Sequence, residues 1–400
     1  MGPQERHHYN YDPVILIAVI LLIGIGLVAV YSASSILAEE RYGDHYYYLR
    51  RQGVFCLFGL LLMILAKNIN YLFYRKLVYF FLGSSLLLLI LLLVPGFGVK
   101  VGGAQRWFRL GLISMQPSEA AKLSLAIFVA YTMSKNVEHM GTFSHGLLPH
   151  LLVAAVFGIL ILQQPDLGTA IIIGMWMLIL LFIGGVNVGQ LLVLLGLITP
   201  VAFYLISHTA YRLNRWWAFL NPWEDPHGFG FQIIHSFLAF GSGGISGVGL
   251  GNSKQKLFYL PEPHTDFILA IIAEEIGFIG VCVLLILFAF VVIRGFRIAL
   301  HAPELFGTYL AMGITCMLAV QVIVNMGVVM ALLPTKGLTL PFISYGGSSL
   351  IVSLIGMGIL MNISKRSLEG SSRPVDSRKH EVSSKQKKLT RNEKRETRNE

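Results

Sequence analysis

The feature that most constrains the fold of this chain is a series of long, uninterrupted apolar runs. A membrane-spanning α-helix needs about 20 consecutive, mostly apolar residues, and continuous rather than alternating runs argue against a β-barrel. The sequence therefore predicts an all-α polytopic membrane protein with about ten transmembrane helices. The expected spans are Pro13–Ser32, Gln52–Ala66, Lys76–Val94, Ser118–Met133, Leu147–Leu162, Gly168–Gly184, Gln190–Ile206, Asp266–Val292, Leu305–Leu332 and Leu340–Ile363.

The composition excludes most soluble proteins. Only 13% of the residues are charged and 55% are apolar or aromatic, whereas an ordinary soluble domain carries roughly 25% charged residues. A disordered chain, a coiled coil and a typical soluble enzyme are excluded. The cysteines Cys56, Cys282 and Cys316 lie inside apolar runs without paired spacing, so we expect buried thiols and neither a disulfide framework nor a zinc site.

The basic residues predict the orientation. An even number of spans puts both termini on one side, and the Lys/Arg-bearing short loops on that side indicate the cytoplasm. We therefore expect a cytoplasmic N-terminus (1–12), an uncleaved first helix, a transmembrane domain (13–363) and a cytoplasmic tail (364–400). The loop residues are Lys67, Arg75, Lys76, Lys135, Arg294 and Arg297.

The tail is strongly basic, with twelve Lys or Arg against six Asp or Glu. It has almost no large apolar residues, so we expect it to be disordered. Because it directly follows a hydrophobic run, we expect it to face anionic lipid and to bind no nucleic acid.

One connection, 208–265, is far longer than the others and is expected on the outer face between the seventh and eighth spans. Its many aromatic residues argue against disorder, and 228–240 resembles an interfacial or re-entrant helix. The next segment, 241–251, contains six glycines. It either forms a nest of backbone N–H groups for a diphosphate or is simply flexible.

Asp266, in the sequence LPEPHTDF, is the leading candidate for chemistry. At the outer mouth of an expected helix, partial desolvation would suit its carboxylate to accept a proton. The structural alternative is an acid in the first turn of a helix capped by His264 or Thr265. Glu262 is a second candidate base.

Two carboxylates, Glu274 and Glu275, lie about two turns deeper in the same expected helix. Glu275 is about 180° around the helix from Asp266, so we expect it to pair with another helix. Ionisable groups at this depth are costly, and a structural or proton-tuning role is favoured for both.

The segment 102–123 combines cations, an aromatic residue and an ion pair. Arg106 and Trp107 suit phosphate and sugar contacts, although interfacial anchoring explains them equally well. Glu119 and Lys122 are spaced to pair on one helix face, and charges kept inside a span are often functional.

Other polar residues lie near the expected outer face. For Asp166, in the tight turn of QQPDLGT, a turn-and-cap role is favoured over catalysis. Broken backbone between the last two expected spans is tolerated where it lines a cavity or is packed in protein. Together these groups suit an amphipathic anion such as a lipid-linked diphosphate sugar. The remaining candidate cations are Arg212, Arg215, Lys254 and Lys336.

Several motifs, in their order along the chain, resemble those of the SEDS family, which includes FtsW, RodA and SpoVE. The resemblance covers nearly everything from Tyr11 to Arg366. TKGLTLPFISYGGSS is similar to the division and sporulation branch, which favours the FtsW type ahead of SpoVE and RodA. The motifs are GAQRWFRLG, QPSEAAKL, QPDLGT, the Arg212–Trp217 region, LPEPHTDFILAIIAEEIG and LPTKGLTLPFISYGGSS.

This resemblance implies a ten-helix protein of the bacterial inner membrane. It implies a peptidoglycan glycosyltransferase that polymerises lipid II into β-1,4 glycan strands at the outer face, in septal synthesis during division. It further implies that Asp266 is catalytic, that Glu119 and Lys122 are linked to activity, and that Trp107 lies near the same cavity. The implied partners are a class B penicillin-binding protein transpeptidase and other divisome membrane proteins.

The expected mechanism is an inverting glycosyl transfer with Asp266 as the general base. The leaving undecaprenyl diphosphate needs cations, supplied by Arg and Lys side chains or by a divalent ion, Mg²⁺ or Mn²⁺; no organic cofactor is expected. The alternatives are a lipid II flippase, an elongation or sporulation paralogue with the same chemistry, or a divisome scaffold.

Overall fold

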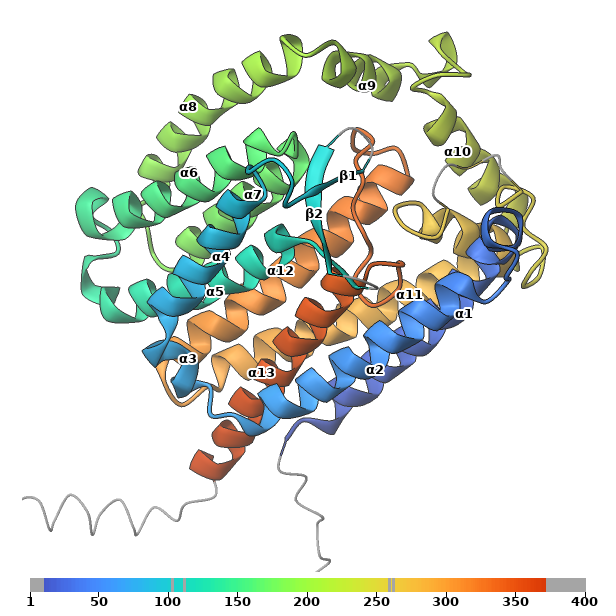
Figure 1. Ribbon diagram of the computed structural model, residues 1–400. Coiled ribbons are helices and arrows are strands. Elements are labelled where there is room, and N and C mark those ends of the chain that lie inside the picture. The colour runs from blue at the N-terminus through green and yellow to red at the C-terminus, as the bar shows by residue number, and fades with distance from the viewer. Residues whose placement is uncertain (1–10, 102–103, 111–112, 258–259, 261–262, 372–400) are drawn as a thin grey trace, which may run out of the picture.

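The computed structural model describes residues 11–101, 104–110, 113–257, 260 and 263–371. Within this part of the chain, seven helices are long and apolar enough to cross a membrane, and two shorter apolar helices accompany them. The protein is therefore a multi-pass helical membrane protein. The α-helices, in the chain order that Figure 1 colours, are α1 (Pro13–Tyr42), α2 (Tyr47–Asn68), α3 (Leu72–Lys76), α4 (Val78–Leu91), α5 (Pro117–Lys135), α6 (Leu148–Gln163), α7 (Leu167–Ile183), α8 (Val188–Ser207), α9 (Ala210–Leu220), α10 (Phe231–Gly243), α11 (Ile268–Leu300), α12 (Leu305–Val329) and α13 (Gly347–Ser371).

Local sequence sets the helix ends. The Asp12 carboxylate caps α1, accepting a hydrogen bond from the N–H two residues later at 3.1 Å, and Pro13 is tolerated in the first turn. The helix ends at Gly43, whose φ of 66° is left-handed, a conformation that glycine adopts without steric cost. Asp166 caps α7 through the N–H of Thr169 at 3.1 Å, which confirms its expected turn-and-cap role.

Each expected apolar run contains a helix, although some boundaries differ. The sequence predicts a last span from Leu340 to Ile363, whereas α13 begins at Gly347 and continues to Ser371. The start is later because the two prolines and the glycines of segment 330–346 keep its backbone irregular. The count of ten spans stays a prediction, and the tail beyond Ser371 lies outside the described residues.

A small antiparallel sheet, which was not expected from the sequence, lies between α4 and α5. The register of β2 against β1 shifts at Arg106, because Lys100 lies opposite Gln105 whereas Val99 lies opposite Trp107. Arg106 is the extra residue at this irregularity, and Ala104 and Phe108 on either side of it are buried. The strands are β1 (Val99–Val101), β2 (Ala104–Leu110) and β3 (Ile113–Met115), paired in the order β1-β2-β3.

Helix α11 connects two ends of the helix bundle. At one end, Arg294 of α11 pairs with Asp12 at 2.6 Å, and Ser367 of α13 donates a hydrogen bond to the carbonyl of His301. The start of α1 and the end of α13 therefore lie together, at the bottom of Figure 1. Asp266, just before α11, lies at the opposite end.

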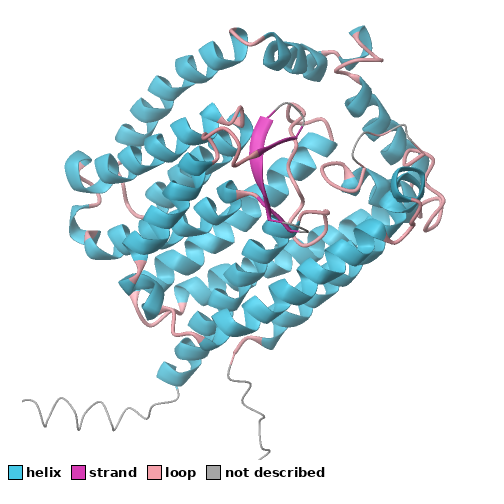
Figure 2. Ribbon diagram, in the orientation of Figure 1, coloured by secondary structure: helices cyan, strands magenta, loops and turns pink. Residues whose placement is uncertain are grey.

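The long connection 208–265 contains two helices, α9 and α10. Helix α10 lies where a helix was expected over 228–240, and it packs against α11. Its interfacial or re-entrant position stays a prediction. Along α8, which is described throughout, Leu191 is the one buried residue. Helices α8 and α9 form an arc that stands away from the other helices, as Figures 1 and 2 show.

Candidate functional site

Asp266 lies in a turn immediately before α11. The helix begins at Ile268 and its N-cap position is Phe267, so neither His264 nor Thr265 caps it. Asp266 precedes the first helical turn and its side chain is partly exposed. The structural alternative considered for this acid, a first-turn residue of a capped helix, is therefore wrong.

Two neighbouring elements hold the backbone of this turn. The side-chain amide of Asn325 in α12 donates to the carbonyl of Asp266 at 3.1 Å and to that of Leu338 at 2.5 Å. The carbonyl of His264 accepts from the N–H of Tyr345 at 2.9 Å, and its ring lies between two tyrosine rings. Burial lowers the pKa of His264 to about 4, so its imidazole is neutral at physiological pH.

The connection between α12 and α13 brings Gly337 beside Asp266 and Lys336 beside α7. A Cβ atom on Gly337 would lie 2.7 Å from Oδ2 of Asp266, so the carboxylate packs directly against glycine backbone. Lys336 lies across Gly168 in the first turn of α7, where a Cβ atom would overlap the lysine side chain. Its ammonium nitrogen is buried and has no hydrogen-bond partner among the described residues. A buried ammonium group without a hydrogen bond lowers the stability of the protein unless an anion binds to it.

The charge of Lys336 depends on its surroundings. Burial lowers the pKa of Lys336 to about 7, the Asp166 and Glu119 carboxylates oppose that effect, and Lys122 and Arg106 reinforce it. The lysine is therefore charged below about pH 7 and increasingly neutral above it.

Two arginines contact the same region. Arg106 of β2 donates to carbonyls of the Gln164–Pro165 turn and lies 3.9 Å from a carboxylate oxygen of Asp166. Arg215 of α9 donates to the carbonyl of Thr335 at 3.2 Å, one residue before the lysine. Three of the expected cations and the expected base thus meet at the α12–α13 connection.

Three other candidate residues lie elsewhere. Trp107 lies opposite Val99 of β1, and Arg212 donates to a carbonyl of α8. The Lys254 side chain is exposed, while its backbone N–H donates to Glu274 at 3.0 Å. Their roles in substrate binding stay predictions, and Glu262, the second candidate base, lies outside the described residues.

Glu119 and Lys122 form the expected ion pair inside α5. Lys122 Nζ lies 2.7 Å from Glu119 Oε1, and the two residues are 4% and 9% exposed. They line a cavity of ≈ 40 Å³ between α5, α12 and α13. A cavity of this size holds a few water molecules and is far too small for a sugar. The pair is therefore placed to influence the charge of Lys336, and contact with substrate stays a prediction.

Breaking this pair should destabilise the protein. Glu119→Gln leaves the Lys122 ammonium buried without its carboxylate, and we expect the free energy of unfolding to fall by about 3–5 kcal/mol. Glu119→Gln combined with Lys122→Met should recover most of that loss, since no unpaired charge remains. SDS-induced unfolding from mixed micelles measures both variants, and a double variant as unstable as the single one would contradict the explanation.

The glycine-rich segment 241–251 does not provide the N–H nest considered for it. The N–H groups of Val248 and Gly249 donate to the carbonyls of Glu274 and Glu275, at 3.0 Å each. Donors that are paired inside the protein are not available to a diphosphate. The flexible alternative is also wrong, because these contacts fix the segment against α11.

Two important residues, Asn325 and Lys256, were not singled out from the sequence. Asn325 is 1% exposed. A polar residue within an apolar span usually has a specific partner, so its position in an apolar run was a sequence signal for such a contact. Lys256 is 5% exposed and pairs with Glu275 at 3.0 Å. Glu275 also accepts a hydrogen bond from Ser32 of α1 at 2.6 Å, which confirms the expected pairing with another helix.

Among the described residues, no group of three or more His, Cys, Asp or Glu side chains could hold a metal ion. Mg²⁺ is commonly held by one or two carboxylates together with substrate phosphates, so the divalent cation stays a prediction. The neighbourhood of Asp266 offers fixed cations, and no step below depends on a metal.

Known proteins resemble the chain over nearly its whole length. Residues 13–369 match the model of the cell cycle proteins FtsW, RodA and SpoVE. The chain is 48% identical over 366 residues to a probable peptidoglycan glycosyltransferase FtsW of Geobacter sulfurreducens, covering 92% of this chain and 98% of the relative.

Two solved structures share the fold. One is a chain from a study of how a peptidoglycan synthase complex coordinates polymerization and crosslinking. It has a TM-score of 0.73 and 34% sequence identity, and the match covers 89% of this chain and 98% of that chain. The other is the rod shape determining protein RodA of Thermus thermophilus (TM-score 0.65, 32% identity, 91% and 99%).

Proposed function

This chain belongs to the FtsW, RodA and SpoVE family of cell cycle proteins, and we propose that it is a peptidoglycan glycosyltransferase of cell division. The SEDS resemblance is thereby confirmed. Similarity to a glycosyltransferase FtsW over 92% of the chain supports the division branch. The observation that carries the proposal is the position of Asp266 against Gly337, next in sequence to Lys336, whose buried ammonium has no hydrogen-bond partner among the described residues.

The substrate is lipid II, and Asp266 is the general base of an inverting transfer. Its carboxylate accepts the proton of the GlcNAc 4-hydroxyl on one lipid-linked sugar while that oxygen attacks C1 of MurNAc on the other. A β-1,4 bond forms, the bond from C1 to the diphosphate oxygen breaks, and undecaprenyl diphosphate leaves. General-base assistance of this kind is worth about 10²–10⁴ in rate.

The diphosphate lies against the cations of the α12–α13 connection. Lys336 supplies a charge that no acceptor in the described part of the chain uses. This charge favours binding of an anion and compensates the charge that develops as the bond breaks. Arg106 holds the Gln164–Pro165 turn and Arg215 holds the carbonyl of Thr335, so their first task is to keep this pocket in shape.

The partner is a class B penicillin-binding protein transpeptidase, together with other divisome membrane proteins. The similarity to a peptidoglycan synthase complex that polymerizes and crosslinks supports such an assembly. The protein acts at the division septum of the bacterial cytoplasmic membrane. Its termini face the cytoplasm, because Lys67, Arg75 and Arg294 are at the end of the bundle where α1 begins and α13 ends.

Reconstitution tests this function. The purified protein, with its cognate transpeptidase, is given lipid II with and without Mg²⁺, and glycan strands are resolved on a gel. Strands support polymerisation. If no strands form in either condition while lipid II crosses the bilayer of liposomes containing the protein, the flippase alternative replaces this proposal.

A further inference from the structure

Helix α11 is broken near its outer end. Gly277 has φ 71° and ψ −169°, a conformation open to glycine alone among common residues. The break separates a short helical piece, 268–276, from the long remainder, and Asp266 lies just before the short piece. Helical continuity therefore does not fix the direction of the piece that carries Asp266.

The glycine-rich segment fills the break. The carbonyls of Glu274 and Glu275 accept from Val248 and Gly249, while the N–H groups beyond the break donate to the carbonyls of Gly244 and Ile245 at 2.9 and 3.2 Å. Polar backbone groups freed within a membrane need such partners. A Cβ atom on residue 243 or 247 would collide with backbone of α11, which explains why glycines occur there.

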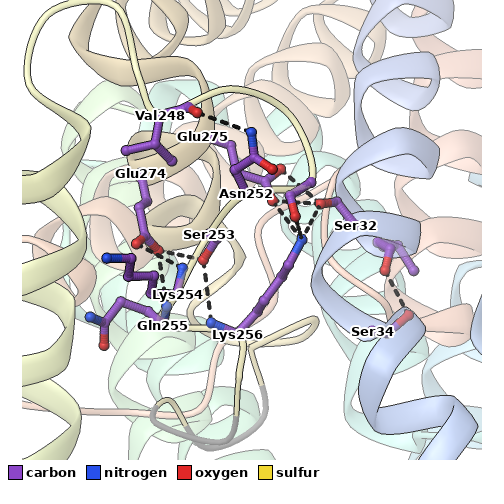
Figure 3. Close-up of polar contacts among 12 residues, drawn as sticks. Ser32, Ser34, Val248, Asn252, Ser253, Lys254, Gln255, Lys256, Glu274 and Glu275 are labelled. Carbon is purple, nitrogen blue, oxygen red and sulfur yellow. Dashed lines mark hydrogen bonds and ion pairs between the residues drawn. The ribbon is translucent and has the colours of Figure 1, made fainter.

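The side chains of the two glutamates add a second layer of contacts, shown in Figure 3. Glu274 accepts from the hydroxyl of Ser253 and from the N–H groups of Lys254 and Gln255. It thereby closes the turn that follows the glycines. These three bonds join residues 253–255 to the short piece of α11 and do not involve the helix beyond the break.

Glu275 ties the short piece to a different helix. Its carboxylate accepts from the hydroxyl of Ser32 in α1 at 2.6 Å and from Lys256 Nζ at 3.0 Å. Lys256 Nζ also donates to Ser32 at 3.2 Å and to the carbonyl of Gly251 at 2.6 Å. Glu275 and Lys256 are 3% and 5% exposed. Water therefore cannot replace these contacts at low cost.

We propose that Glu275, Lys256 and Ser32, here named the Glu275 latch, are positioning residues that hold the short piece of α11 against α1 and so place Asp266. From Gly277 to Asp266 the lever is about 15 Å long at 1.5 Å per residue, so a tilt of about 10° moves the carboxylate by about 3 Å. A displacement of about 1 Å can cost about 10²-fold in rate. The inference rests on the proposed function.

Steady-state kinetics on the full-length protein with its partner transpeptidase test the latch. In Glu275→Gln and in Lys256→Met we expect kcat for strand synthesis to fall at least about 10-fold while KM for lipid II changes less than about 3-fold. Lys256→Arg, which keeps the charge, should retain most of the activity. The double variant Glu275→Gln/Lys256→Met should be no worse than the poorer single one, because the two charges act as one unit.

A matched control is available at the other end of the same two helices. Asp12→Asn breaks a partly buried ion pair between the residue that caps α1 and Arg294 of α11, at the end of α11 opposite to Asp266. It should lower thermal stability yet keep kcat within about 2-fold. An equal loss of kcat in Asp12→Asn would show that Glu275 contributes general stability only, and would overturn the proposal.

Hydrogen exchange gives a readout that does not depend on activity. We expect faster amide exchange across 244–257 in Glu275→Gln and Lys256→Met, and unchanged exchange there in Asp12→Asn. Unchanged exchange in Glu275→Gln contradicts the latch, as does faster exchange with normal kcat. A wild type that makes no strands contradicts the proposed function instead.

Discussion

Asp266→Asn should reduce glycan strand synthesis by about 10²–10⁴, because the amide cannot accept the proton that the carboxylate accepts. The substitution preserves shape. It also leaves the backbone contacts of the turn, through Asn325 and Tyr345, unchanged. We therefore expect a folded protein that binds lipid II and forms no strands within the assay time. A glycan-strand gel beside thermal unfolding curves measures both properties.

The control for this experiment is Asp166→Asn, which alters an acid in the same region with a different task. Asp166 caps α7 through Thr169, so its loss should cost about 1 kcal/mol of stability. Because its carboxylate also raises the pKa of Lys336, we expect a partial loss of turnover near pH 7 that is far smaller than the loss in Asp266→Asn. If Asp266→Asn polymerised normally while staying folded, Asp266 would be a structural residue. Glu262 and Glu119 would then be the next bases to test.

The expected helices were predictable because each rests on a run of apolar residues, a signal that needs no tertiary contact. The capping role of Asp166 and the pairing of Glu119 with Lys122 were likewise local, three residues apart. The small sheet was not predictable, because its three strands are short and basic residues interrupt the alternation of apolar and polar side chains that predicts a strand.

Long-range pairing was the harder part of the site. That Glu275 would need a partner follows from burial alone, but the identity of Lys256 and Ser32 depends on how a glycine-rich segment folds into a broken helix. The same holds for Lys336, whose neighbours Gly168 and Asp166 are distant in sequence. Such contacts depend on how distant segments pack together, and the spacing of residues along the sequence does not predict them.

The last prediction concerns the charge of Lys336. Because burial lowers its pKa to about 7, from an ordinary value of about 10.4, the free enzyme loses this charge as pH rises through 7. The lipid II diphosphate stays anionic over the same range. We therefore expect kcat/KM for lipid II to fall from pH 6 to pH 8.5, with a midpoint near the lysine pKa, in initial rates measured at low substrate.

Three variants separate this explanation from a general effect of pH. Lys336→Met should lower kcat/KM at pH 6 by about 10- to 100-fold, which corresponds to one charged hydrogen bond. Lys336→Arg, whose guanidinium stays charged, should remove the fall above pH 7 even if its activity at pH 6 is reduced. Gly168→Ala keeps the lysine but places a methyl group where its side chain lies, so it should reduce kcat/KM although alanine favours the α7 helix. A Lys336→Met enzyme with the wild-type pH profile would show that another group titrates, and the diphosphate would then have to be assigned to Arg106 or Arg215.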